Sequence, residues 1–173
     1  MAFYCSHIAL HTIEENENVM IYGPVIMNSE VICYKGDWDS VKVIGVNQGR
    51  EAEKSLAQET YPQIEEFRDI SQKGILYTME DGQVDAIIQD LTSAAMVPTY
   101  NYMPVSTHDY ISYVLVVDKE FAQTEAFSDL IKSYNKAVEK LNEPTYLAEK
   151  LGVEEEWLND KTIQFLTLDE SED

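Results

Sequence analysis

Residues 41–95 read VKVIGVNQGREAEKSLAQETYPQIEEFRDISQKGILYTMEDGQVDAIIQDLTSAA, and this stretch decides the fold class. It opens with an apolar run, residues 41–46, of the kind found in strands that are buried on both faces. The elements predicted after the turn at 47–49 alternate between helix and strand: helix 50–60, strand 64–67, helix 71–80 and strand 84–88. This alternation predicts an α/β fold whose parallel strands are joined by right-handed crossovers.

The flanking sequence adds further predicted elements on both sides. Before the central stretch we expect a short helix that begins at Ser6, and extended runs at 19–21, 25–27 and 30–34. After it come a Tyr- and Pro-rich link at 99–107, a strand at 111–117 and a helix from about 125 to 141. Apolar residues spaced by threes and fours mark that helix as amphipathic: Phe127, Leu130, Ile131, Tyr134, Val138 and Leu141.

The composition limits the classes of partner. A hydrophobic share of 45% is that of a globular protein, which argues against disorder throughout. The formal charge of −20 disfavours nucleic acid and anionic membrane surfaces, since both would be repelled. A small anion is still permitted, because backbone amides can bind it locally. Part of the acidic excess forms a tail that we expect to be solvated: Asp169, Glu170, Glu172 and Asp173.

Cysteine spacing and the N-terminal residues bear on metal binding and location. Cys5 and Cys33 form no CxxC unit, so a zinc site is not expected, and two free buried thiols are favoured over a disulfide that stays open. The N-terminus lacks the features of a signal peptide, which predicts a cytoplasmic location for the chain as written. If the chain is a fragment of an exported protein, its location is extracytoplasmic.

The first candidate binding residues are Gln48, Gly49 and Arg50, where the first strand of the central stretch turns into a helix. Ligands of open α/β sheets bind outside the carboxyl ends of the strands, and free amides at a helix N-terminus favour an anion. The alternative is structural: Gly49 serves a tight turn and Arg50 is a solvated residue of the first helical turn.

Further candidates lie at other junctions. Thr92 and Ser93 follow Asp90 at the next strand-to-helix turn; we expect Asp90 to cap the helix, and the hydroxyl of Thr92 remains open as a ligand contact. Ser6 fits an N-cap better than a ligand contact, although one residue can serve both roles. Tyr100 could stack on a flat ligand or cover the sheet edge, and the second role is slightly favoured.

No metal or cofactor is expected. His7 and His11 are spaced by four residues and so share a helix face, but they lack a third ligand nearby, which favours ordinary surface histidines over a metal site. His108 lies far from both in sequence.

Several segments together resemble type II periplasmic solute-binding proteins, in the branch that binds nitrate, sulfonates, taurine and thiamine precursors. The resemblance rests on VKVIGVNQGREAEK, GQVDAIIQD, YVLVVDKEF and LGVEEEWLND, and on FYCSHIALHTIEENENVMIYGPVIMNSEVICY near the start. It implies one complete three-layer lobe over 35–109 and a partial lobe formed by 1–34 and 110–173, which carries the C-terminal helices. The opening strands of that partial lobe have no counterpart, so the chain resembles an N-terminally truncated or reduced relative.

The resemblance implies a protein that binds a small solute, anionic or heterocyclic, without transforming it, and that could serve a membrane permease. An alternative is an enzyme of thiamine or menaquinone precursor synthesis on the same fold, although the sequence offers no convincing nucleophile–base pair. A third hypothesis is a homo-oligomeric assembly protein with no retained ligand. An incomplete lobe leaves a sheet edge or an apolar face uncovered, which predicts a homo-oligomer.

Overall fold

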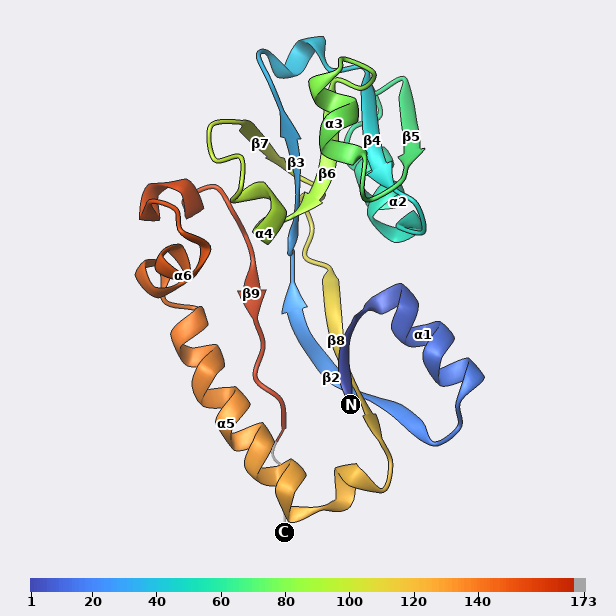
Figure 1. Ribbon diagram of the computed structural model, residues 1–173, viewed down its shortest axis with the longest axis vertical. Helices are drawn as coiled ribbons and strands as arrows, with labels where there is room; N and C mark the ends of the chain where they lie inside the picture. The colour runs from blue at the N-terminus through green and yellow to red at the C-terminus, as the bar shows by residue number, and fades with distance from the viewer. Residues whose placement is uncertain (170–173) are drawn as a thin grey trace. The chain divides into compact units, whose positions relative to one another are not determined.

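The computed structural model describes residues 1–169 of the 173-residue chain, so Glu170, Glu172 and Asp173 of the expected acidic tail lie outside the described residues. The chain forms two compact units (Figure 1). The middle unit is Glu30–Asp109, and the terminal unit combines Met1–Ser29 with the chain from Tyr110 onward. No helix in the described range is long and apolar enough to cross a bilayer. Cys5 and Cys33 are both buried thiols and are not joined in a disulfide, which confirms the favoured prediction.

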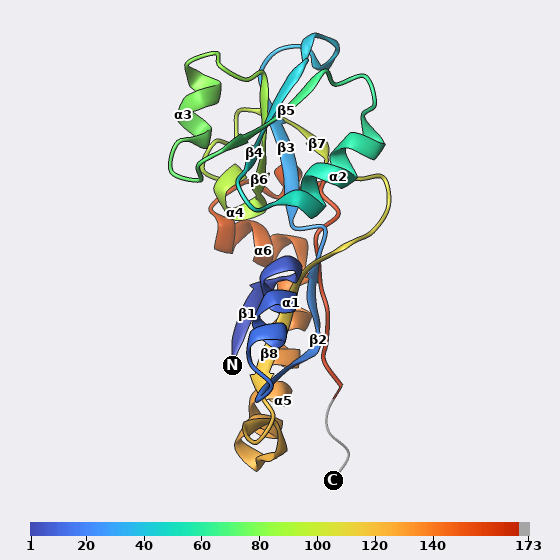
Figure 2. The ribbon, with the colours of Figure 1, turned by 90° about the vertical axis from the view of Figure 1, so that its right-hand side faces the viewer.

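The middle unit is built on a five-stranded sheet in the order β5-β4-β6-β3-β7. Strand β4 runs parallel to β5 and β6, whereas β3 is antiparallel to both β6 and β7. The helices α2 and α3 lie on opposite faces of this sheet, giving three layers (Figure 2). The elements are β3 (Glu30–Tyr34), η1 (Trp38–Ser40), β4 (Val43–Asn47), α2 (Glu51–Thr60), β5 (Glu66–Ile70), α3 (Ile75–Glu80), β6 (Ala86–Asp90), α4 (Leu91–Ala94) and β7 (Asn101–Pro104).

Central strands β4 and β6 are apolar because helices cover both of their faces. Ile44 and Val46 of β4 and Ile87 of β6 are almost fully buried, as the apolar run predicts. Gly45 leaves room for a side chain of the neighbouring strand β5: a Cβ there would lie 2.7 Å from Ile70 Cδ1. The parallel β4, β5 and β6 therefore confirm the α/β expectation.

Local turns explain where the observed elements differ from the predicted ones. The backbone N–H of Gly74 donates to the Ser71 carbonyl, so residues 71–74 form a turn and α3 begins only at Ile75. The Asp85 carboxylate accepts from the backbone amides of Lys42 and Val43, and β6 begins after it. The expected link at 99–107 contains strand β7, which pairs with β3. These two ladders also place residues 30–34 in the middle unit, whereas the sequence grouped them with the other lobe.

The terminal unit contains a four-stranded antiparallel sheet in the order β1-β8-β2-β9. Side chains of β8 alternate between its two faces. Val114 and Val116 pack with Ala9 of α1, while Leu115 and Val117 pack with Phe127 of α5. The elements are β1 (Ala2–Cys5), α1 (Ser6–Glu15), β2 (Val19–Met27), β8 (Ile111–Asp118), η2 (Phe121–Gln123), α5 (Glu125–Leu141), α6 (Pro144–Leu151), η3 (Glu155–Leu158) and β9 (Gln164–Phe165).

The extended runs expected at 19–21 and 25–27 form a single strand, β2, which continues through Gly23 and Pro24. The strand absorbs both residues by shifts in its register with β8. Gly23 also allows a close approach by Leu168, since a Cβ at position 23 would lie 2.7 Å from Leu168 Cδ2. The absence of a side chain there therefore lets the C-terminal segment pack against β2.

The segment around β9 is held on α5 by two asparagines. The side chain of Asn135 donates to the Leu168 carbonyl and accepts from the Leu168 N–H, both at 2.9 Å. Asn142 makes the same pair of bonds with Phe165, at 2.8 and 3.0 Å. Between them, the Tyr134 hydroxyl donates to the Leu166 carbonyl at 2.9 Å. Side chains of α5 and of its C-cap residue thus bond the backbone groups of this segment that a neighbouring strand would otherwise bond.

Candidate functional site

The carboxyl ends of β4 and β6 meet at one edge of the middle unit's sheet. β4 ends at Asn47 and β6 at Asp90. Since β3 is antiparallel to β6, its first residue, Glu30, lies opposite Asp90 in the register. We call this edge, with the turns that follow it, the carboxyl edge; it comprises Glu30, residues 47–53 and residues 90–93.

The turn after β4 has a structural reason for its glycine. The Arg50 N–H donates to the Asn47 carbonyl at 3.1 Å, which closes a four-residue turn, and the Gln48 N–H donates to the Ile70 carbonyl at 3.0 Å. Gly49 has a φ of +81°, a conformation that favours glycine. Gln48 and Gly49 are exposed, so their polar groups are accessible at this edge.

Arg50 is held between two buried glutamates. Its Nη1 donates to Glu53 Oε1 at 2.9 Å and lies 3.7 Å from Glu30 Oε1. Glu53 is 7% exposed and Glu30 is 5% exposed, while the Arg50 side chain is 26% exposed. The structure therefore engages Arg50 in an internal acidic cluster, and it is not the solvated first-turn residue of the structural alternative.

The first turn of α2 contains acidic residues. Glu51 and Glu53 lie in its first turn, where carboxylates interact favourably with the helix dipole. Asn47 Oδ1 and Glu53 Oε2 are buried acceptor atoms in this region, and neither has a hydrogen-bond partner among residues 1–169. A buried acceptor without a donor is costly, so these atoms favour a group that donates hydrogen bonds.

Asp90 caps α4, which confirms the role expected for it. Its carboxylate accepts from the Ser93 backbone N–H at 2.9 Å and from the Ser93 hydroxyl at 3.1 Å. The Thr92 hydroxyl also donates to Asp90 in a short hydrogen bond. Both candidate hydroxyls are thus oriented by Asp90, and a ligand would meet this carboxylate together with the outer lone pairs of the hydroxyls.

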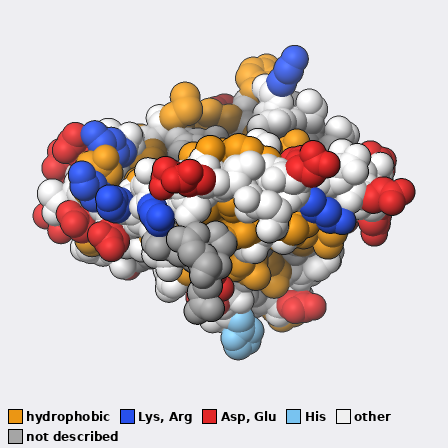
Figure 3. Space-filling model, turned by 90° about the horizontal axis from the view of Figure 1, so that it is seen from below, with side chains coloured by type: hydrophobic (Ala, Val, Ile, Leu, Met, Phe, Trp, Pro, Cys, Tyr) orange, Lys and Arg blue, Asp and Glu red, His pale blue; other side chains and the backbone are white. Residues whose placement is uncertain are grey.

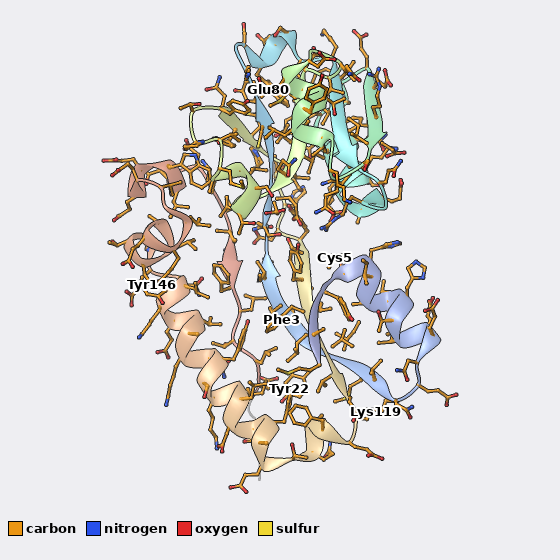
Figure 4. The ribbon with its side chains drawn as sticks, in the orientation of Figure 1. Phe3, Cys5, Tyr22, Glu80, Lys119 and Tyr146 are labelled. Atoms are coloured by element: carbon orange, nitrogen blue, oxygen red, sulfur yellow. The ribbon has the colours of Figure 1, made fainter. Side chains whose placement is uncertain are left out.

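The remaining two candidates lie elsewhere. Tyr100 has Lys35 Nζ 4.8 Å from its ring centre and precedes β7, whose first residue, Asn101, pairs with the last residue of β3. Tyr100 therefore lies at the opposite edge of the sheet. The length of β3, from Glu30 to Tyr34, separates this edge from the carboxyl edge by about 13 Å, at ~3.3 Å per residue. Lys35 and Glu80 form an ion pair of 2.7 Å on that side, and Glu80 is labelled in Figure 4.

Ser6 belongs to the terminal unit. Its expected role as N-cap is wrong: the N-cap position of α1 is Cys5, and no side chain caps the helix. Strand β1 passes directly into α1, so Ser6 is the first residue of the helix and the N-cap position lies one residue before it.

The sequence did not single out Glu30 and Glu53. One signal for Glu30 was present, since an acidic residue directly precedes the apolar run VICY. Glu53 had no such signal, because its position in a polar helix matches that of an ordinary surface residue.

The histidines form no metal centre with neighbouring side chains. The His7 and His11 rings lie 4.7 Å apart on α1, and His11 Nδ1 is 3.7 Å from Glu14 Oε2. Across residues 1–169, no group of three or more His, Cys, Asp or Glu side chains could hold a metal ion.

Comparison with known proteins identifies the fold. No protein-family model and no curated protein sequence matches the chain. Solved structures do. The ligand-binding component of an ABC-type import system from Staphylococcus aureus, solved with zinc bound, matches with a TM-score of 0.68 and 11% identity over 96% of this chain and 67% of its own.

Two other solved structures agree with this match. An ABC transporter structure from Parabacteroides distasonis has a TM-score of 0.69, 12% identity and coverage of 96% of this chain and 68% of its own. The alkanesulfonate-binding protein SsuA from Xanthomonas axonopodis pv. citri, bound to MOPS, has a TM-score of 0.60, 14% identity and the same coverage. The chain thus has the α/β fold of type II periplasmic binding proteins and spans about two thirds of their length.

Proposed function

We propose that the chain binds a small solute at the carboxyl edge and does not transform it. The observation that carries the proposal is the convergence of Glu30, Asn47 and Asp90, with both following turns, on one edge of the sheet. Ligands of open α/β sheets bind at this position. The likeness to ABC-type ligand-binding proteins supports the same role, and a membrane permease is the partner that it suggests.

The charges at this edge favour a solute that carries an ammonium or several hydrogen-bond donors. Four carboxylates, those of Glu30, Glu51, Glu53 and Asp90, accompany a single guanidinium, that of Arg50. The unpartnered acceptors Asn47 Oδ1 and Glu53 Oε2 favour the same chemistry. A sulfonate or nitrate would face repulsion from the carboxylates, although the sequence alone favoured an anion.

Binding without chemistry is supported by the arrangement of potential catalytic groups. In the part of the chain that the structure describes, none of the rings of His7, His11 and His108 hydrogen-bonds to a Ser, Thr or Cys side chain. Nucleophilic catalysis of the usual kind needs such a nucleophile–base pair. An enzyme of precursor synthesis therefore has no specific observation in its favour.

A thermal-shift screen tests the proposal. The unmodified chain would be heated with amino acids, amines, polyamines, sulfonates, phosphate and pyrimidines. A ligand at 100 times its dissociation constant stabilises the folded chain by about 2.7 kcal/mol, which is readily measured. We expect an amine-bearing solute to raise the melting temperature, and calorimetry then gives its affinity.

Two variants locate the site. Glu53→Gln and Asp90→Asn keep the shape of the side chain and remove its charge, and both should weaken binding by about tenfold or more. Glu80→Gln, at the opposite edge, is the matched control and should leave the affinity unchanged. Stabilisation by sulfonates alone would contradict the proposed ligand charge, and no stabilisation by any compound would contradict binding itself.

A further inference from the structure

The terminal unit leaves an apolar hollow open beside β1. The hollow has a volume of about 300 Å³ and lies between β1 and α5. Its lining includes Met1, Phe3, Leu115, Leu130, Ser133 and Tyr134, none of which has a charged side chain. Phe3, labelled in Figure 4, lies with its ring centre 5.9 Å from that of Tyr134. Met1 is 56% exposed and Phe3 53% exposed, so apolar surface on this side faces solvent.

Strand β1 also has a free edge. It pairs with β8 on one side, from Ala2↔Val116 to Cys5↔Tyr113, and no strand within residues 1–169 pairs with its other side. Exposed edges in folded proteins are usually protected by charged residues, proline or bulges. The sequence of β1, AFYC, has none of these, and its ladder with β8 is regular. A free edge beside an apolar hollow is suited to the addition of another strand.

We propose that the occupant of this surface is a second copy of the chain, with β1 of each copy paired antiparallel across a two-fold axis. Identical strands in this arrangement are self-complementary, because each presents the same row of donors and acceptors to the other. Phe3 and Met1 of each copy would then cover the hollow of the other.

The distribution of charge favours a like partner at this surface. The chain carries a net charge of −20, so two copies repel each other over most of their surfaces. The proposed contact avoids this repulsion. Strand β1 has no charged residue, and the three acidic residues of α5 (Glu125, Asp129 and Glu139) are balanced by Lys132, Lys136 and Lys140. A cationic foreign partner would instead gain most from the acidic remainder of the chain.

This geometry predicts how the dimer responds to conditions. Two four-residue strands form few ladder bonds, so most of the affinity comes from apolar burial, and we expect dissociation at micromolar concentrations. Added salt should strengthen the dimer, because it screens the repulsion between two acidic chains and leaves the uncharged contact intact. A contact between opposite charges would respond in the opposite direction.

Sedimentation equilibrium of the 173-residue chain, from micromolar to several hundred micromolar, tests the proposal. Phe3→Lys and Ser133→Arg each place a cation in the contact, and each should raise the dissociation constant by about tenfold or more. Tyr77→Lys is the matched control: it changes the net charge by the same amount at an exposed position of α3, where the tyrosine is 69% exposed. Circular dichroism shows whether each variant is folded.

The outcomes separate the proposal from its competitors. A dimer that is weakened by Phe3→Lys and Ser133→Arg but not by Tyr77→Lys supports it. A chain that stays monomeric at the highest concentration overturns it, and so does a monomer that carries a co-purified peptide or lipid in the hollow. A dimer that resists both substitutions would have another interface. If Phe3→Lys does not fold, Ser133→Arg decides the question alone, since Ser133 is exposed on α5.

Discussion

Arg50 offsets the free-energy cost of burying two carboxylates at the carboxyl edge. Two carboxylates with almost no exposure to water, those of Glu30 and Glu53, lie beside it. Taking carboxylates out of water is expensive unless a cation and hydrogen bonds accompany them. A mostly buried guanidinium within 3.7 Å of both supplies that compensation. The arginine in the turn after β4 is therefore needed because β3 and α2 each place a buried glutamate beside that turn.

Replacing Arg50 by methionine should lower the free energy of unfolding by about 2–3 kcal/mol, because Glu53 loses its cation while it stays buried. The measurement is urea denaturation followed by circular dichroism. Arg68→Met is the control, since Arg68 pairs with Glu66 at 2.8 Å but both side chains are largely exposed. Exposed pairs contribute little, so this variant should lose clearly less stability. Equal losses in the two variants would contradict the role given to Arg50.

For single residues, the sequence predicted where they lie in the fold better than it predicted which side chains they contact. Gln48, Gly49, Arg50, Thr92 and Ser93 lie at the edge where their strand-to-helix context placed them. The contact of Arg50 with Glu30 could not be predicted, because Glu30 is brought to it by an antiparallel ladder whose register depends on the whole sheet. Local spacing carries no information about such a contact.

Helix α5 shows how one element can take the place of a strand. Asn135 of α5 and Asn142, the C-cap residue that follows its last turn, are seven residues apart, a rise of about 10.5 Å along a helix. Their partners, Phe165 and Leu168, are three residues apart, which spans about 10 Å in extended chain. The two spacings match, so both amides can bond the backbone of the C-terminal segment at once. Figure 1 shows the segment that follows β9 running alongside α5.

This match predicts reciprocal effects in hydrogen exchange. Asn135→Ala should expose the Leu168 amide to exchange and leave Phe165 protected, and Asn142→Ala should do the reverse, because each asparagine accepts from one of these N–H groups. Each variant should lose about 1–2 kcal/mol of stability. NMR exchange rates provide the measurement, and each variant is the control for the other. Loss of protection at both amides in either variant would show that the segment detaches as a whole.

Elements with strong local signals were predicted well. Helix α5 runs over Glu125–Leu141, as the apolar spacing indicated, because Thr124 caps its start and Pro144 opens the next helix. Strands β7 and β9 were not predicted. They are short, and they are strands because of their partners: β7 pairs with β3, and β9 pairs with β2. A ladder with a distant segment leaves no periodic pattern in so few residues.

At the scale of the whole molecule, Tyr61 of the middle unit and Tyr134 of the terminal unit both have a raised pKa. In the middle unit, burial, together with repulsion from Tyr34, raises the pKa of Tyr61 to about 12. In the terminal unit, burial raises the pKa of Tyr134 to about 12. Both hydroxyls donate to backbone carbonyls, Tyr61 to Pro104 and Tyr134 to Leu166. Deprotonation removes the donated hydrogen and places a charge where burial opposes it.

These shifts predict a loss of stability in alkali. Because the folded pKa lies above the unfolded value of 10, the contribution of each tyrosine is complete below pH 10 and is lost as the pH rises towards 12. Tyr61→Phe should flatten this part of the pH profile for the middle unit only, and Tyr134→Phe for the terminal unit only. Circular dichroism with exchange readouts in each unit measures the effect. An unchanged profile in both variants would contradict the assignment.

The order in which the chain is made sets a constraint on how the terminal unit forms. Strand β8 lies between β1 and β2 in the sheet, yet it follows the whole of Glu30–Asp109 along the chain. At a synthesis rate of about 5–20 residues per second, β1 and β2 wait roughly 4–16 s for it. During that interval the middle unit, which is continuous in sequence, can fold, whereas the apolar strands at the start have no partner. A chain that is truncated before Ile111 and released from the ribosome should therefore show a protease-resistant middle and a sensitive beginning.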